Sequence, residues 1–226
     1  QLYLSLMSKK IKNIRFDVWN NENLFYLKSS LSRIFKIICH YEIFKITENV
    51  KGDILECGVF KGNSLIRFIS FRDLLKLKNK KIYGFDVFGN FPRQQISEDN
   101  IFAKNHDKQI GKGYTASFLK KSLEKKGLKS FKLIKGDILK SLPKFLKNKK
   151  KLKISFLHLD MDVYEPTKFV LNKLFKMVSK NGVILIDDYG QVAGATKATN
   201  EFLKNNKRLK IKNLKFNNRL KFIVKK

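Results

Sequence analysis

Apolar and polar residues alternate along this chain in blocks that predict helices and strands in turn. Residues 1–50 place apolar side chains such as Leu31, Ile34 and Ile38 at helical spacing, so we expect a mostly helical N-terminal region. Beyond Gly52, apolar runs of strand length recur between longer helical patterns. The expected strands are residues 53–57, 81–86, 131–135, 154–160, 183–187, 209–212 and 220–224.

Helical patterns separate most of these strands. The expected helices open at 58–64, span 115–126, start near Pro166 and span 195–204, while 87–113 has the polar composition of a loop and 216–219 suits a hairpin turn. Strands that alternate with helices predict an α/β fold: a mostly parallel seven-stranded sheet with helices on both faces. We expect two parts, a helical extension or substrate lid over 1–50 and the α/β domain over 51–226.

Composition narrows the class of protein. The chain has 226 residues, of which 43% are hydrophobic, enough for a core, yet no apolar run approaches the roughly 20 residues of a membrane helix. Cys39 and Cys57 form no CxxC pair, which disfavours a zinc site and fits a reduced, cytoplasmic setting. No secretory signal is expected.

The net charge of +30 permits two interpretations. One is a nucleic-acid binder. The other, which we favour, is a solvated surface, because the lysines are spread along the whole chain and arginine and tryptophan are scarce. Either way the charge attracts acidic surfaces, phosphates and polyanionic glycans at low salt.

Carboxylates stand where the five expected core strands end. They are Glu56, Asp86, Asp137, Asp160 and the pair Asp187-Asp188. Helix caps and loop starts favour Asp in general, but the chain has only 19 acidic residues against 49 basic ones. Ligands of open α/β sheets bind beyond the carboxyl ends of the strands, so these acids mark the expected functional edge.

The turn after the first strand has the form of a modified nucleotide-binding loop. Gly58 and Gly62 allow a tight turn, while Phe60 stands where a dinucleotide loop needs a second glycine, and Ser64 opens the helix. A cofactor without a pyrophosphate, such as S-adenosylmethionine, tolerates Phe60, and its carboxylate suits the helix N-terminus. A generic tight turn is the alternative.

Two further strand ends fit an adenosine ligand. Asp86 is placed to accept hydrogen bonds from both ribose hydroxyls, a device that NAD enzymes share. Gly136-Asp137 ends the third strand beside the expected adenine pocket, although Asp137 equally suits a cap for the next helix.

Asp160, Asp187 and Asp188 close adjacent strands and are expected to converge. Three close anions repel one another, and a hard divalent cation such as Mg²⁺ removes that repulsion. Such an ion lowers the pKa of a bound substrate hydroxyl. Asp160 and Asp162 are the candidates for taking the proton, with Asp160 acting beside the metal preferred, and His158 shares the face of Asp160 but suits a structural role. A helix-cap and salt-bridge cluster is the alternative.

Four segments occur in an order that resembles the macrocin O-methyltransferase family. They are Glu56–Gly62, Phe85–Pro92, Leu159–Thr167 and Asp187–Gly190. The resemblance covers roughly Gly52 to Leu203 and implies a Rossmann-like class I methyltransferase fold, S-adenosylmethionine, a Mg²⁺-type ion and a sugar or glycoside hydroxyl as acceptor. It implies metal ligation by Asp160, Asp187 and Asp188.

The resemblance also implies cofactor contacts from Glu56, Gly58, Gly62, Ser64 and Asp86. The expected acceptor is the hydroxyl of a small molecule or a glycan, either a bacterial surface glycan or a natural product, and a homo-oligomer stays open. Three alternatives remain: a nucleic-acid methyltransferase on the same fold, a non-enzymatic binding protein on a decayed scaffold, and an NAD-dependent oxidoreductase that Phe60 disfavours.

Overall fold

The computed structural model describes residues 14–226, which form two compact units that divide after Ile38. The first unit holds α2 (Ile14–Lys28) and the beginning of α3 (Leu31–Lys45). The helical expectation is confirmed for these elements, while its part over residues 1–13 lies outside the described residues. The expected boundary near residue 50 stays a prediction.

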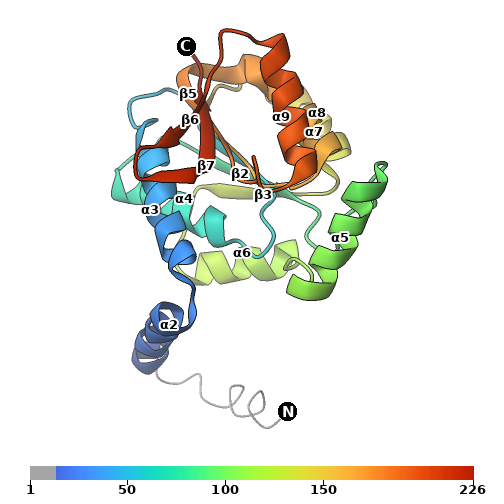
Figure 1. Cartoon of the computed structure of the whole chain (residues 1–226). Helices are drawn as coiled ribbons and strands as arrows, with labels where there is room; N and C mark the ends of the chain where they lie inside the picture. The colour runs from blue at the N-terminus through green and yellow to red at the C-terminus, as the bar shows by residue number, and fades with distance from the viewer. Residues whose placement is uncertain (1–13) are drawn as a thin grey trace. The chain divides into compact units, whose positions relative to one another are not determined.

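A seven-stranded sheet forms the centre of the second unit, in the order β3-β2-β1-β4-β5-β7-β6 (Figure 1). The strands are β1 (Asp53–Cys57), β2 (Ile82–Asp86), β3 (Phe131–Lys135), β4 (Ile154–Leu159), β5 (Val178–Ile186), β6 (Ile211–Leu214) and β7 (Asn217–Val224). The first five are parallel, and β7 is antiparallel to both β5 and β6. This confirms the predicted α/β class. The strand order reverses between β1 and β4, which places the ligand crevice of such sheets beyond the carboxyl ends of these two strands.

Helices connect the strands. They are α4 (Asn63–Leu74), α5 (Ser97–Ile110), α6 (Ala116–Lys125), α7 (Ile138–Lys147), α8 (Tyr164–Leu174), the 3₁₀ turn η1 (Phe175–Met177) and α9 (Ala193–Asn205). Among the described helices, none combines the length and apolarity that a membrane crossing requires.

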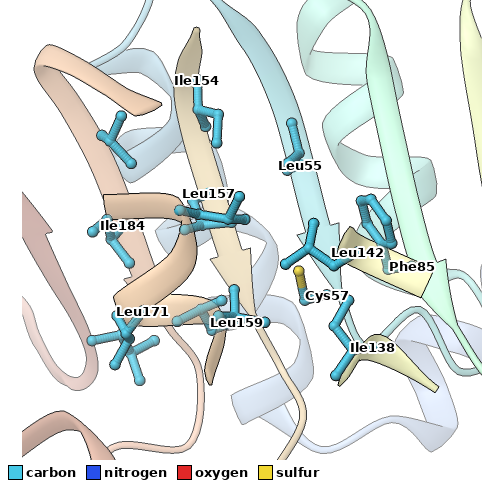
Figure 2. Close-up of a cluster of buried hydrophobic side chains, with 14 of the residues drawn as sticks. Leu55, Cys57, Phe85, Ile138, Leu142, Ile154, Leu157, Leu159, Leu171 and Ile184 are labelled. Atoms are coloured by element: carbon cyan, nitrogen blue, oxygen red, sulfur yellow. The ribbon is translucent and has the colours of Figure 1, made fainter. Parts of the chain in front are cut away.

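Successive strand residues point to opposite faces, and each face has its own core. Leu55, Leu157 and Ile184 pack in one cluster with Leu142 of α7 and Leu171 of α8, all fully buried (Figure 2). This core fixes the strands whose carboxyl ends carry the acids.

The other face is packed by aromatic rings. Phe156 of β4 contacts Phe44 of α3 and Phe68 of α4, with ring centroids 5.2 and 4.9 Å apart. Cys39 and Cys57 are buried free thiols.

Helix α5 corrects the prediction that residues 87–113 form a loop. Its sequence has few apolar residues, and tertiary contacts hold it instead: Asp99 accepts a hydrogen bond from the backbone N–H of Tyr164 at 2.8 Å, and Asp107 accepts one from that of Phe91 at 3.1 Å. Glu98 and Asp99 in its first turn also complement the helix dipole.

The C-terminal hairpin turns at residues 215–216, earlier than the predicted 216–219. Leu214 pairs with Asn217, so a two-residue turn closes the hairpin and Asn217 already belongs to β7. The Asn217 side chain accepts a hydrogen bond from the backbone N–H of Arg219 at 2.9 Å, which explains the turn-like composition inside the strand.

Candidate active site

Three carboxylates converge at the carboxyl ends of β4 and β5. The ladder register pairs Leu159 with Ile186, so Asp160 and Asp187 leave the sheet side by side, and the Asp187 N–H donates to the Leu159 carbonyl at 2.9 Å. One oxygen each from Asp160, Asp187 and Asp188 lies within 4.8 Å of the others. Asp187 is buried, whereas Asp160 and Asp188 are half-buried and reachable from solvent. An all-oxygen donor set of this kind fits a hard divalent cation.

Asp162 lies in the loop that joins β4 to α8, beside this trio. Its backbone adopts φ +64°, the left-handed region that Asp tolerates better than most residues. Its N–H donates to Asp188 Oδ2 at 3.3 Å, and its carbonyl accepts from the Ala195 N–H at 3.0 Å. The loop is therefore held at the rim of the acidic cluster from both sides.

The glycine loop after β1 needs its glycines for different reasons. A Cβ at Gly58 (φ +95°) would lie 1.7 Å from the backbone oxygen of Asp160, so the loop passes directly over the end of β4. Gly62 (φ +85°) begins α4 beneath Leu119, and Ser64 is buried in its first turn. Phe60 takes the left-handed conformation (φ +52°) that a glycine usually supplies at such a turn.

Asp86 holds this loop in place. Its Oδ2 accepts the backbone N–H groups of Val59 and Phe60, each at 2.8 Å, and its Oδ1 accepts that of Phe88 at 2.6 Å. Asp86, which is predicted to bind the ribose of the cofactor, thus also fixes the backbone on which a cofactor would lie. Its contact with ribose stays a prediction.

The end of β3 shows the alternative role weighed for Asp137. The Asp137 side chain accepts the Leu139 N–H at 2.9 Å and so caps α7, and Gly136 (φ +133°) makes the preceding turn. Gly136 also donates its N–H to the Asp86 carbonyl at 2.9 Å, which joins the ends of β2 and β3. Adenine contact by either residue stays a prediction.

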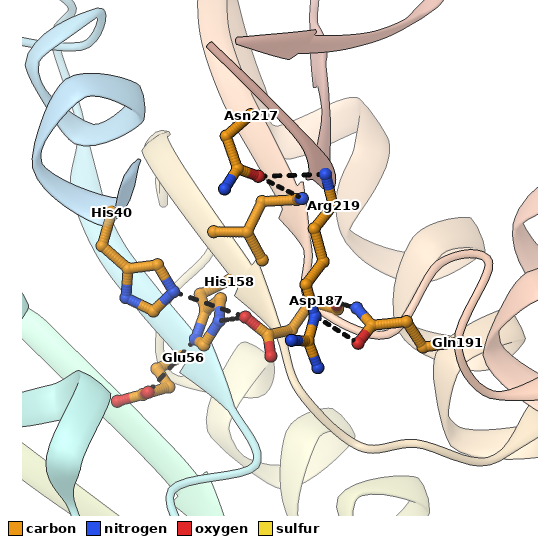
Figure 3. A network of polar contacts seen from close by, with 8 residues as sticks. His40, Glu56, His158, Asp187, Gln191, Asn217 and Arg219 are labelled. Carbon is orange, nitrogen blue, oxygen red and sulfur yellow. Dashed lines mark hydrogen bonds and ion pairs between the residues drawn. The ribbon is translucent and has the colours of Figure 1, made fainter. Parts of the chain in front are cut away.

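A buried histidine network stands behind Asp187 (Figure 3). His158 of β4 contacts Glu56 Oε1 through Nδ1 at 3.1 Å and Asp187 Oδ1 through Nε2 at 3.5 Å. His40 of α3 reaches the same Oδ1 at 3.4 Å. Burial disfavours the charged imidazole, but the contacts with Asp187 and Glu56 outweigh it and raise the pKa of His158 to about 10.

The network was only partly accessible to sequence reasoning. The alternation of β4 placed His158 near Asp160, whereas His40 lies 147 residues before Asp187 and carries no local signal. Glu56, a predicted cofactor contact, is fully buried and paired with His158. Its Oε2 has no hydrogen-bond partner among the described residues, so the carboxylate keeps an acceptor for a ligand.

Helix α5 links the two halves of this edge, which the loop prediction missed. Asp99 binds the first N–H of α8, and its Oδ1 would lie 2.4 Å from a Cβ at Gly194 in α9. At the other end of α5, His106 packs edge-on against Phe60 at 5.2 Å between ring centroids. The helix therefore contacts both the glycine loop and the helix that follows the acidic cluster.

Comparisons with known proteins agree with this arrangement. The sequence profile described as Macrocin-O-methyltransferase (TylF) matches residues 39–215. No curated protein matches the chain by sequence. The structure resembles calicheamicin methyltransferase CalS11 (TM-score 0.74, 19% identity, 98% of this chain and 89% of that one) and the O-methyltransferase NovP (TM-score 0.72, 18% identity, 84% and 79%). At these identities the likeness shows the fold.

Proposed function

Since the chain belongs to the macrocin O-methyltransferase (TylF) family and is an S-adenosylmethionine-dependent O-methyltransferase, we propose that it methylates a sugar hydroxyl with the help of a divalent cation. The family membership sets aside the NAD-dependent oxidoreductase and the decayed scaffold weighed from the sequence. The observation that carries the metal proposal is the convergence of Asp160, Asp187 and Asp188.

The ligand atoms of these three carboxylates show whether they fit a divalent cation. All three groups offer carboxylate oxygens, the ligands that Mg²⁺ prefers, and two of them are reachable from solvent for metal-bound water or substrate. A bound cation would supply Lewis acidity, which lowers the pKa of a coordinated hydroxyl. Asp160, Asp187 and Asp188 would hold it.

We assign removal of the proton from the acceptor hydroxyl to a carboxylate of the β4–α8 loop. Asp160 stands in the trio, and Asp162 follows it in a backbone conformation fixed by Asp188 and Ala195. A carboxylate that accepted this proton would become a neutral acid as the acceptor oxygen formed a bond to the methyl carbon and the methyl–sulfur bond broke, which would give a methyl ether and S-adenosylhomocysteine. Asp162 is the alternative base.

The cofactor is assigned to the glycine loop. S-adenosylmethionine supplies the methyl group from its sulfonium. Gly58, Phe60, Gly62 and Ser64 lie at the turn into α4 and would lie beneath it, where backbone N–H groups of the helix N-terminus favour a carboxylate. Asp86 is assigned to the ribose, Gly136-Asp137 to the adenine side, and Glu56 Oε2 to a donor of the cofactor.

The likeness to CalS11 supports a sugar as the proposed acceptor class. CalS11 is described as a TDP-rhamnose 3'-O-methyltransferase, and we extend a sugar acceptor to this chain on that likeness. The N-terminal region over residues 1–50, expected from the sequence to be a helical extension or a substrate lid, is proposed as the lid. A glycan or a glycosylated small molecule satisfies the same chemistry.

The experiment measures transfer of a labelled methyl group to sugar acceptors, before and after EDTA treatment. We expect EDTA to abolish turnover, Mg²⁺ to restore it, and Asp187→Asn to lower kcat at least about a hundredfold, or about 2.7 kcal/mol. Calorimetry should show that this variant keeps its affinity for S-adenosylmethionine. Glu124→Gln, which alters an exposed carboxylate of α6, is the matched control and should leave kcat unchanged.

Undiminished turnover in EDTA would contradict the metal proposal. Methylation of RNA in place of sugars, at physiological salt, would favour the nucleic-acid alternative suggested by the net charge of +30.

A further inference from the structure

Four ionisable side chains from four elements meet behind the acidic trio. His40 comes from α3, Glu56 from β1, His158 from β4 and Asp187 from the end of β5, and their exposed fractions are 0, 0, 0 and 4%. Burial of charged groups costs several kcal/mol unless they are paired. An arrangement of this kind in a sheet core therefore calls for a role that apolar residues cannot fill.

The contacts of this network lead from Glu56 through His158, and separately from His40, to Asp187. The β1–β4 ladder pairs Glu56 directly with His158, which brings Glu56 Oε1 to 3.1 Å from His158 Nδ1. The other ring nitrogen, Nε2, lies 3.5 Å from Asp187 Oδ1. His40 Nε2 approaches the same oxygen at 3.4 Å. The imidazoles of His40 and His158 thus both contact one oxygen of the Asp187 carboxylate (Figure 3).

Aromatic packing prevents the two imidazoles from turning. Phe68 of α4 stacks on His40 with centroids 5.2 Å apart and meets His158 edge-on at 5.0 Å. The two imidazoles also meet each other edge-on at 5.4 Å. The ring planes are therefore set by the packing of α3 and α4 on the sheet, independently of any ligand.

We propose that Glu56, His158 and His40 are positioning residues, which hold the Asp187 carboxylate in the orientation that makes it a metal ligand. Asp187 belongs both to the acidic trio and to the histidine network. Because both imidazoles contact its Oδ1, the Asp187 carboxylate keeps a fixed orientation toward Asp160 and Asp188. The inference rests on the proposed metal-dependent function, because it assigns a role in the same site.

A second arrangement uses the same atoms. His40, His158 and Asp187 each place a ligand atom within 4.8 Å of the others, a geometry that also suits a transition metal. We favour positioning because Glu56 and Asp187 flank His158 on both ring nitrogens and the cluster is closed to solvent. The two arrangements differ in which metal binds and which residues it needs.

The experiment measures Mn²⁺ affinity by electron paramagnetic resonance on the full chain, for the wild type and for matched substitutions of His158. His158→Asn retains a group at the Nδ1 position but cannot reach Asp187, whereas His158→Gln places an amide near the Nε2 position. We expect His158→Asn to weaken Mn²⁺ binding about ten- to a hundredfold and His158→Gln to restore much of it. A purely structural role would give equal affinities for the two variants once both are folded.

Controls separate this inference from the proposed function. His106→Gln removes the remaining histidine, outside the network, and should keep the wild-type Mn²⁺ affinity. Should His158→Asn fail to fold, His40→Asn provides the second test, with an expected loss in the same direction, because asparagine cannot replace the Nε2 atom through which His40 contacts Asp187. Calorimetry with S-adenosylmethionine monitors the glycine loop in each variant.

Each outcome decides between the accounts. Wild-type binding of Mn²⁺ with no loss in His158→Asn and His40→Asn overturns the positioning role and leaves the proposed function intact. No binding of Mn²⁺ by the wild type overturns both. Tight Zn²⁺ binding that survives removal of Asp160 and Asp188 but disappears with His40→Asn establishes the alternative site and overturns the positioning role.

Discussion

Gly58→Ala tests how closely the cofactor loop lies on the metal edge. The Cβ of alanine would lie 1.7 Å from the backbone oxygen of Asp160 and 2.5 Å from its carbonyl carbon. Backbone atoms cannot swing aside as a side chain can. The β1 loop and the β4 end must therefore separate, against the hydrogen bonds that join Gly58 to Phe85 and Asp160 to Cys57, each at 2.9 Å.

Two terms add up in the expected cost. A non-glycine residue in the left-handed region costs about 1–2 kcal/mol, and forced overpacking adds about 1–3 kcal/mol or more. Gly58→Ala should therefore lower the free energy of unfolding by about 2–5 kcal/mol, a large part of the roughly 5–15 kcal/mol of an ordinary domain.

Gly127→Ala is the matched control. Gly127 has a similar positive φ, +82° against +95° at Gly58, but a Cβ there would meet no atom within 4 Å. It should cost only the conformational part, about 1–2 kcal/mol. Urea unfolding followed by circular dichroism measures both, and equal losses in the two variants would falsify the close approach of the loop to Asp160.

Three further expectations follow from single side chains. Arg72→Met should lower the free energy of unfolding in urea by about 3 kcal/mol, because buried Arg72 donates hydrogen bonds to the carbonyls of Lys129 and Ser130 at 2.8 and 2.9 Å. The control Arg93→Met alters an exposed arginine and should change this free energy little. Similar losses in the two variants would contradict the role of Arg72. The Cys57 thiol should react with thiol reagents only after unfolding, because burial and the neighbouring Glu56 raise its pKa far above the ordinary value; rapid labelling of the native chain would refute this. Asp86→Ala should weaken S-adenosylmethionine binding at least about tenfold in calorimetry, since it removes three backbone contacts of the loop as well as the expected ribose acceptor, and unchanged affinity would count against the assignment.

The sheet was predictable because its strands are buried on both faces. The mainly apolar run at 154–159, which includes Ser155 and His158, and the apolar run at 183–186 leave few alternatives to a central parallel strand, and β4 and β5 lie there. Helix α5 was not predictable in this way. Its identity as a helix depends on Asp99 and Asp107, whose partners Tyr164 and Phe91 lie in other segments.

The acidic edge was predictable for a topological reason, and its supports were not. Parallel strands end on one side, so Asp160, Asp187 and Asp188 were expected together, and the structure brings them within 4.8 Å. No sequence pattern links His40 to Asp187. That contact arises from the packing of α3 over the sheet, as does the closure around His158.

The site of the cation decides the central claim most directly. A crystal of the full chain soaked in Mn²⁺ and measured for anomalous scattering should show one strong peak bonded to carboxylate oxygens of Asp160, Asp187 and Asp188. A peak between His40 and His158, or none at the ends of β4 and β5 at saturating Mn²⁺, would contradict the account.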